Sequence, residues 1–105
     1  MVRGDVHAIT LPRARRRVQH GRRFAVIVQA DDLLALSTIV ICPTSTSTPP
    51  ATFHPEVEIA EEPTRVMCEM VGAVDSRMLG ENVAHLTYDE MQMVDEALEL
   101  VLDLA

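Results

Sequence analysis

Short runs of apolar or alternating residues occupy most of the first 75 positions and predict strands. Some alternate apolar and polar side chains, which is typical of a strand with one face buried. Others are continuous and rich in Val and Ile, which is typical of a strand buried on both faces. The expected strands cover residues 6–11, 24–29, 37–42, 53–59 and 66–71.

Polar and proline-containing segments separate these runs. Residues 31–34 predict a turn or a single helical turn. Pro43 closes the run at 37–42, and the Ser- and Thr-rich stretch 44–50 predicts a connecting loop. Residues 61–63 predict another turn before the last of these strands.

The pattern changes near residue 87 and predicts a helix to the end of the chain. Thr87 and Glu90 have the spacing of a capping box, in which each side chain bonds the other residue's backbone N–H. Apolar residues then recur at helical spacing and form a stripe: Met91, Val94, Leu98 and Val101. Met93, Leu100 and Leu104 widen this stripe beyond what a small monomer buries. We therefore expect a core helix that also contributes to a dimer contact.

These elements predict one domain over residues 1–105, mainly β with α. Five or six short strands followed by one helix favour a small, partly closed antiparallel barrel with a packed C-terminal helix. Hydrophobic residues make up 48% of the chain, which excludes a mainly disordered protein. The longest nearly apolar run, 33–42, is half of what a membrane span requires, and the N-terminus lacks the apolar core of a secretion signal. We expect a cytoplasmic protein that does not enter a membrane.

Charge is divided unevenly along the chain. All nine basic residues are Arg, and residues 1–30 have a net charge of +6, whereas residues 31–105 have a net charge of −13. Six of the arginines fall within residues 13–23, and guanidinium groups bind phosphate and carboxylate in a bidentate manner. The segment is therefore either a local anion site or a solvated loop that balances an acidic body. The overall net charge of −7 argues against general coating of nucleic acid.

Several classes of site lack their sequence signatures. The four His and two Cys have no zinc-ligand spacing, so we expect no metal and no cofactor. Cys42 and Cys68 stand among apolar residues and are expected in the core. No glycine-rich phosphate loop and no nucleophile elbow is present. The remaining candidates are polar groups at strand ends.

Five collinear segments carry a resemblance to a known family. They are Arg3-Gly4-Asp5-Val6, Arg23-Phe24-Ala25-Val26-Ile27-Val28, Ile39-Val40-Ile41-Cys42-Pro43-Thr44-Ser45, Cys68-Glu69-Met70, and the closing segment from Leu86 to Leu98. Together they resemble the MazF/PemK toxins of type II toxin–antitoxin systems over nearly the full length. The resemblance implies the small SH3-like antiparallel barrel shared with CcdB, a metal-independent endoribonuclease acting on single-stranded RNA, a cognate antitoxin and a homodimer.

The resemblance also implies the site residues. Arg23 falls on the family's principal catalytic arginine, Thr44 on a threonine of the same site, and Ser45 on a residue that helps to hold RNA. Glu69 falls on a carboxylate that acts as acid or base. The family has a proline where this chain has Phe24, and a glutamine where it has Met70. Phosphate contacts are expected from the basic segment: Arg13, Arg15, Arg16, Arg17 and Arg22.

Such a site can cleave RNA with few groups. The 2′-OH attacks the neighbouring phosphorus, so a base, an acid and a cationic cradle for the phosphorane are sufficient. Glu69 and His20 are the base candidates; His20 has an ordinary pKa near 6.5 that suits proton transfer, and it is otherwise a loop residue. The alternative is a non-catalytic or decayed member of the same fold that binds a protein or inhibits DNA gyrase. Arg23 together with Thr44 favours the ribonuclease.

Overall fold

The computed structural model describes residues 1–10 and 23–104. The strands are β1 (Asp5–Ile9), β2 (Phe24–Ile27), β3 (Thr38–Ser45), β4 (Glu56–Ile59), β5 (Glu62–Val66), β6 (Gly72–Asp75) and β7 (Leu79–His85). Three 3-10 turns, η1 (Asp31–Leu33), η2 (Cys68–Met70) and η3 (Ser76–Met78), and one helix, α2 (Tyr88–Leu102), complete the described elements. The expected arginine cluster and His20 lie outside the described residues: Arg13, Arg15, Arg16, Arg17, His20 and Arg22.

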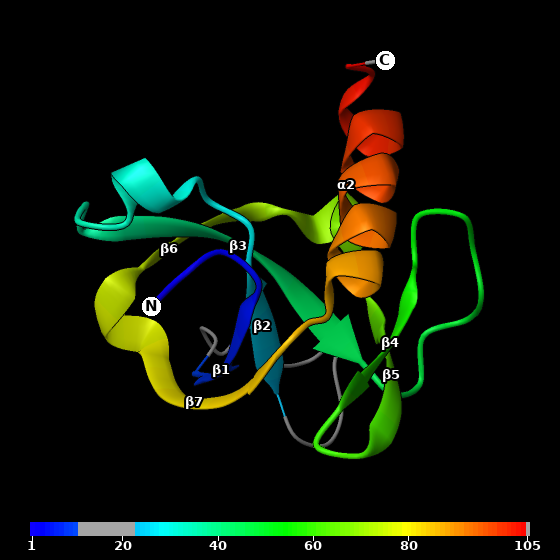
Figure 1. The fold of residues 1–105 in the computed structure, drawn as a ribbon, viewed down its shortest axis with the longest axis horizontal. Helices are drawn as coiled ribbons and strands as arrows, with labels where there is room; N and C mark the ends of the chain where they lie inside the picture. The colour runs from blue at the N-terminus through cyan, green and yellow to red at the C-terminus, as the bar shows by residue number, and fades with distance from the viewer. Residues whose placement is uncertain (11–22, 105) are drawn as a thin grey trace.

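The strands form one curled antiparallel sheet in the order β4-β5-β3-β2-β1-β7, with β6 paired to β3 (Figure 1). β3 is the organising strand. Its first half pairs with β6, its middle with β2, and its last two residues with β5. The expected fold, mainly β with a C-terminal helix on a curled antiparallel sheet, is confirmed.

Alternating side chains give the sheet two apolar faces. One face carries Val26, Cys42 and Val66 and packs against Val94 and Ala97 of α2. The other face carries Ile27, Ile39 and Ile41 of β2 and β3, with Val74 of β6 beside them. Both cysteines are fully buried and free, as expected for core residues.

The C-terminal helix begins as the sequence predicts. The Thr87 hydroxyl accepts a hydrogen bond from the Glu90 N–H at 3.2 Å, and the Glu90 carboxylate accepts one from the Thr87 N–H at 2.8 Å. The apolar stripe faces the core, where Val94 and Ala97 are buried. Met93, Leu100 and Leu104 remain exposed in the single chain. No described helix has the length and apolar character needed to cross a bilayer.

Several expected local structures are wrong. The strand expected to close at Pro43 continues as β3 to Ser45, because Pro43 pairs with β2 and the two residues after it pair with β5. The run at 66–71 is not a strand: β5 ends at Val66, and Cys68 begins the 3-10 turn η2. The turn expected at 61–63 lies one residue earlier, because Ala60 and Glu61 both have positive φ and close a tight hairpin. Pro63 is therefore inside β5, in the part that pairs with β4 rather than with β3, where a missing N–H is tolerated.

Candidate functional site

A row of polar side chains crosses the sheet where β2, β3 and β5 meet. Ser45 pairs directly with Arg65 of β5. Continuing the β2–β3 register from the pair Ala25 and Pro43 places Arg23 opposite Ser45 on its other side. The Arg23 carbonyl accepts a hydrogen bond from the Ile9 N–H, so the pairing of β2 with β1 continues to this residue. A hydroxyl thus lies between two strands that each contribute an arginine.

Thr44 occupies a different position from its neighbour. It is 2% exposed, and its hydroxyl donates a hydrogen bond to the Phe24 carbonyl at 3.2 Å. Because side chains alternate along β3, Thr44 shares the core face of Cys42, whereas Ser45 shares the opposite face with Arg23. Thr44, which the family resemblance puts in one site with Arg23, thus lies on the other face of β3, and its one hydroxyl proton is bonded to the Phe24 carbonyl within the protein.

Ser45 is nearly buried but makes only a local contact. Its hydroxyl accepts a hydrogen bond from the Ser47 N–H at 3.1 Å and lies 3.2 Å from the Ser47 hydroxyl. Either hydroxyl of this pair can be the donor. The Ser45 proton can consequently turn toward an anion opposite Arg23 without breaking a backbone bond.

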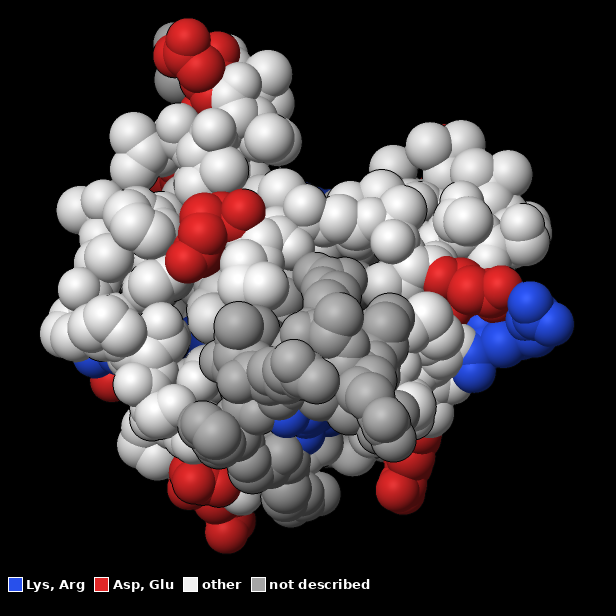
Figure 2. All heavy atoms as spheres, turned by 180° about the vertical axis from the view of Figure 1, so that it is seen from behind, with Lys and Arg blue, Asp and Glu red and all other residues white. Residues whose placement is uncertain are grey.

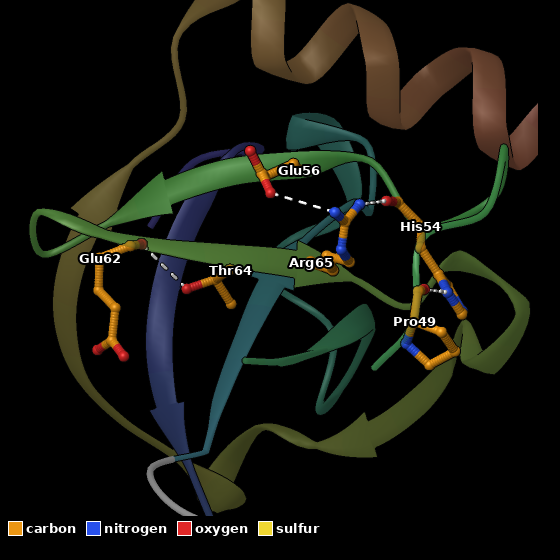
Figure 3. Close-up of polar contacts among 6 residues, drawn as sticks. All are labelled: Pro49, His54, Glu56, Glu62, Thr64 and Arg65. Atoms are coloured by element: carbon orange, nitrogen blue, oxygen red, sulfur yellow. Dashed lines mark hydrogen bonds and ion pairs between the residues drawn. The ribbon is translucent and has the colours of Figure 1, made fainter. Parts of the chain in front are cut away.

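Arg65 connects this row to a histidine. Its guanidinium donates to the Glu56 carboxylate at 3.2 Å and to the His54 carbonyl at 3.4 Å (Figure 3). The side chain is 26% exposed, so it is held in place yet partly open to solvent. Sequence analysis assigned no role to Arg65, because nothing in the linear spacing shows that it faces Ser45.

Glu69 lies on η2 and is paired with His54. The Glu69 Oε2 is 2.6 Å from the His54 Nε2, and the His54 Nδ1 is 2.8 Å from the Pro49 carbonyl. The imidazole is 6% exposed and the Glu69 side chain 39% exposed. Sequence analysis missed His54, because the pair spans 15 positions and depends on how the 49–54 segment folds over η2.

The surroundings of His54 raise its pKa. Burial acts to lower the pKa, but hydrogen bonds to Glu69 and to the Pro49 carbonyl favour the protonated ring and outweigh burial. The charge of Arg65 opposes them weakly. His54 is therefore more strongly protonated than a free histidine near neutral pH.

This shift predicts how stability depends on pH. A folded-state pKa raised above the ordinary histidine value of 6.5 adds stability that is complete below pH 6.5 and is lost as pH rises through the folded pKa. We expect the urea-unfolding free energy to fall from pH 6 to pH 8 in the wild type and to fall less in H54Q. Equal slopes in both proteins would contradict a stabilising role for protonated His54.

Acidic groups are spread over the described surface. Figure 2 shows them on the rear face as separate groups, with few basic side chains among them. Within residues 1–10 and 23–104, no group of three or more His, Cys, Asp or Glu side chains is placed to hold a metal ion. The polar row has groups that can bind an anion. The Glu69–His54 pair has groups that can move a proton.

A family comparison agrees with this arrangement. Residues 2–102 match the model of the PemK-like, MazF-like toxins of type II toxin–antitoxin systems. The chain belongs to this family. This match confirms the expected family membership. The family is known for endoribonuclease toxins.

Named relatives point the same way. The chain is 32% identical over 106 residues to a Mycobacterium tuberculosis protein named "Putative toxin Rv3098A", and the match covers 99% of each.

Solved structures of the PemK/MazF family share the fold. An endoribonuclease from a mycobacterial species, solved with its cognate antitoxin, aligns with a TM-score of 0.84 at 17% identity over 100% of this chain and 97% of that one. The Mycobacterium tuberculosis toxin MazF-mt6 aligns at 0.79 and 17% identity over 96% and 98%. A MazE–MazF structure from Deinococcus radiodurans aligns at 0.73 and 21% identity over 100% and 97%.

Proposed function

We propose that this PemK/MazF-family toxin is a metal-independent endoribonuclease that cleaves single-stranded RNA at the strand ends carrying Arg23 and Ser45. The observation that supports this most directly is the register: extended by two residues from the pair Ala25 and Pro43, it puts the Arg23 guanidinium and the Ser45 hydroxyl at opposite positions of neighbouring strands. Both groups can donate hydrogen bonds to a phosphate, and a guanidinium does so in a bidentate manner.

The reaction needs only rearrangement within the RNA. The 2′-oxygen forms a bond to phosphorus, the bond from phosphorus to the 5′-oxygen breaks, and the 2′-hydroxyl proton moves to a base. The leaving 5′-oxygen takes up a proton. The products are a 2′,3′-cyclic phosphate and a 5′-hydroxyl, and no water or metal takes part in this step.

The expected site residues have distinct roles in this proposal. Arg23 stabilises the negative charge that builds on the phosphorane, and Ser45 donates to a non-bridging oxygen. Thr44 acts as a positioning residue, because its bond to the Phe24 carbonyl fixes the start of β2. Glu69 is the base, with His20 as the other candidate. The arginines at 13, 15, 16, 17 and 22 hold flanking phosphates.

The partners follow from the family and its solved relatives. We propose a cognate antitoxin, since a relative of the same fold was solved with one. We also propose a homodimer that buries the exposed apolar side chains of α2 and of the residues just after it: Met93, Leu100 and Leu104. The RNA substrate places the activity in the cytoplasm.

The test is cleavage of a long single-stranded RNA by the purified protein in excess EDTA. We expect fragments with 2′,3′-cyclic phosphate and 5′-hydroxyl ends, identified by phosphatase and kinase treatment before end labelling. Ends with a 5′-phosphate, or cleavage that stops in EDTA, would contradict the mechanism. Absence of cleavage over varied RNAs would favour the non-catalytic binding protein instead.

A further inference from the structure

The hydrogen bonds of His54 determine where its protons are. Nδ1 faces the Pro49 carbonyl, which can only accept, so Nδ1 carries a hydrogen (Figure 3). Nε2 faces Glu69 Oε2 at 2.6 Å, and a contact this short requires one proton between the two atoms. The pair therefore holds that proton either as imidazolium and carboxylate or as imidazole and carboxylic acid.

The ionised form fits the surroundings better. Protonation of His54 is favoured by both of its hydrogen bonds, and an imidazolium donates to both acceptors at once. Glu69 then has Oε2 occupied by His54, while Oε1 has no hydrogen-bond partner among the described residues. With 39% of its side chain exposed, Glu69 can reach solvent or a ligand through Oε1.

Charged and titratable groups also lie on the elements around this pair. Arg65 of β5 donates to the His54 carbonyl, and Glu56 of β4 neutralises that arginine. Glu96 of α2 lines a hollow with Thr52 and Pro55 on the segment that carries His54. The Cys42 thiol of β3 is hydrogen-bonded to Cys68. This bond and burial raise the pKa of Cys42, so the thiol stays neutral.

We propose that His54 is a positioning residue for RNA cleavage: its ring N–H holds Glu69 through Oε2 and orients the carboxylate so that Oε1 accepts the 2′-hydroxyl proton. This inference rests on the proposed function and deepens it. In the step, the 2′-oxygen loses its proton to Glu69 Oε1 as the bond from that oxygen to phosphorus forms. His54 keeps both ring protons throughout, and the Glu69 proton later leaves to the 5′-oxygen or to solvent.

A pH profile separates this role from a merely structural one. In the wild type, kcat/KM should show an acidic and an alkaline fall, and the alkaline fall should follow the loss of the His54 proton. H54Q retains a donor that does not titrate, so the alkaline fall should disappear. H54A lacks any donor and should lose about 10- to 100-fold in kcat/KM, more than H54Q.

A matched control is available at another histidine. His85 Nδ1 lies 2.9 Å from the Asp5 carboxylate, on β7 and β1, outside the polar row. H85Q should leave both limbs of the profile unchanged. If H54Q and H85Q both give the wild-type profile, the inference is overturned.

A spectroscopic measurement tests the pair without RNA. Long-range nitrogen–proton NMR of the intact protein should show both ring nitrogens of His54 protonated at pH 6, and E69Q should shift the titration of His54 to lower pH. A His54 titration that E69Q does not change overturns the inference while leaving the proposed function standing. A coupled titration in a protein that cleaves no RNA overturns the proposed function and, with it, this role of His54.

Discussion

Replacing Arg23 by alanine should abolish detectable RNA cleavage. In the proposed reaction the guanidinium supplies fixed positive charge at the strand end beside β3, where charge would build on the phosphorane. Removing a single donor of this kind costs about 10²- to 10³-fold in turnover, and the loss of a full charge costs at least that much. Single-turnover cleavage of a labelled RNA, with enzyme in excess, measures the effect on chemistry directly.

Two further arginine variants sharpen this experiment. R23K keeps the charge but loses the planar fork, so it should retain intermediate activity. R77A is the matched surface control: Arg77 is 89% exposed and pairs with Asp75 at 2.7 Å, away from the polar row. Wild-type cleavage by a correctly folded R23A would show that the reacting phosphate lies elsewhere, and loss of activity in R77A would show an unspecific effect of charge.

Replacing Leu86 by alanine should cause the largest loss of stability. Leu86 is 1% exposed and joins β7 to α2, with its N–H donating to the Gly4 carbonyl. Its side chain belongs to the apolar cluster beneath the helix. This cluster also contains Val6 and Val94. Truncation of a buried leucine leaves a cavity and costs about 2–5 kcal/mol in unfolding free energy. Urea unfolding followed by circular dichroism measures the change.

Leu36 provides the comparison for this variant. It is 54% exposed and lies outside the proposed dimer surface, so L36A removes the same atoms from water rather than from the core. We expect a change within about 0.5 kcal/mol. Equal losses in L86A and L36A would contradict the packing of α2 against the sheet.

Local signals explain the elements that sequence analysis identified correctly. The capping box at Thr87 and Glu90 acts within four residues, so its spacing alone locates the start of α2. The apolar run before Pro43 similarly indicates the first part of β3, although the strand and its buried stretch continue to Ser45. In contrast, the apolar run after Val66 is equally compatible with a strand and with a buried turn, and η2 forms there because its residues pack beneath α2.

The site was predictable only in part. Arg23, Ser45 and Glu69 follow from the family resemblance, since each belongs to a recognisable segment. The contribution of Arg65 depends on its pairing with Ser45, and that of His54 on its contact with Glu69. Neither contact has a sequence signal, because both join segments whose relative register is set by the folded sheet.

By itself, the sequence determined a small, mainly β domain closed by one capped helix, together with an arginine and hydroxyls at strand ends. Those features depend on alternation, capping and residue type, which act over a few neighbouring positions. Only the tertiary structure decided that Ser45 rather than Thr44 shares the face of Arg23. It also decided that Glu69 pairs with His54. A one-residue step along β3 reverses the face on which a side chain lies, so strand register separates Ser45 from Thr44.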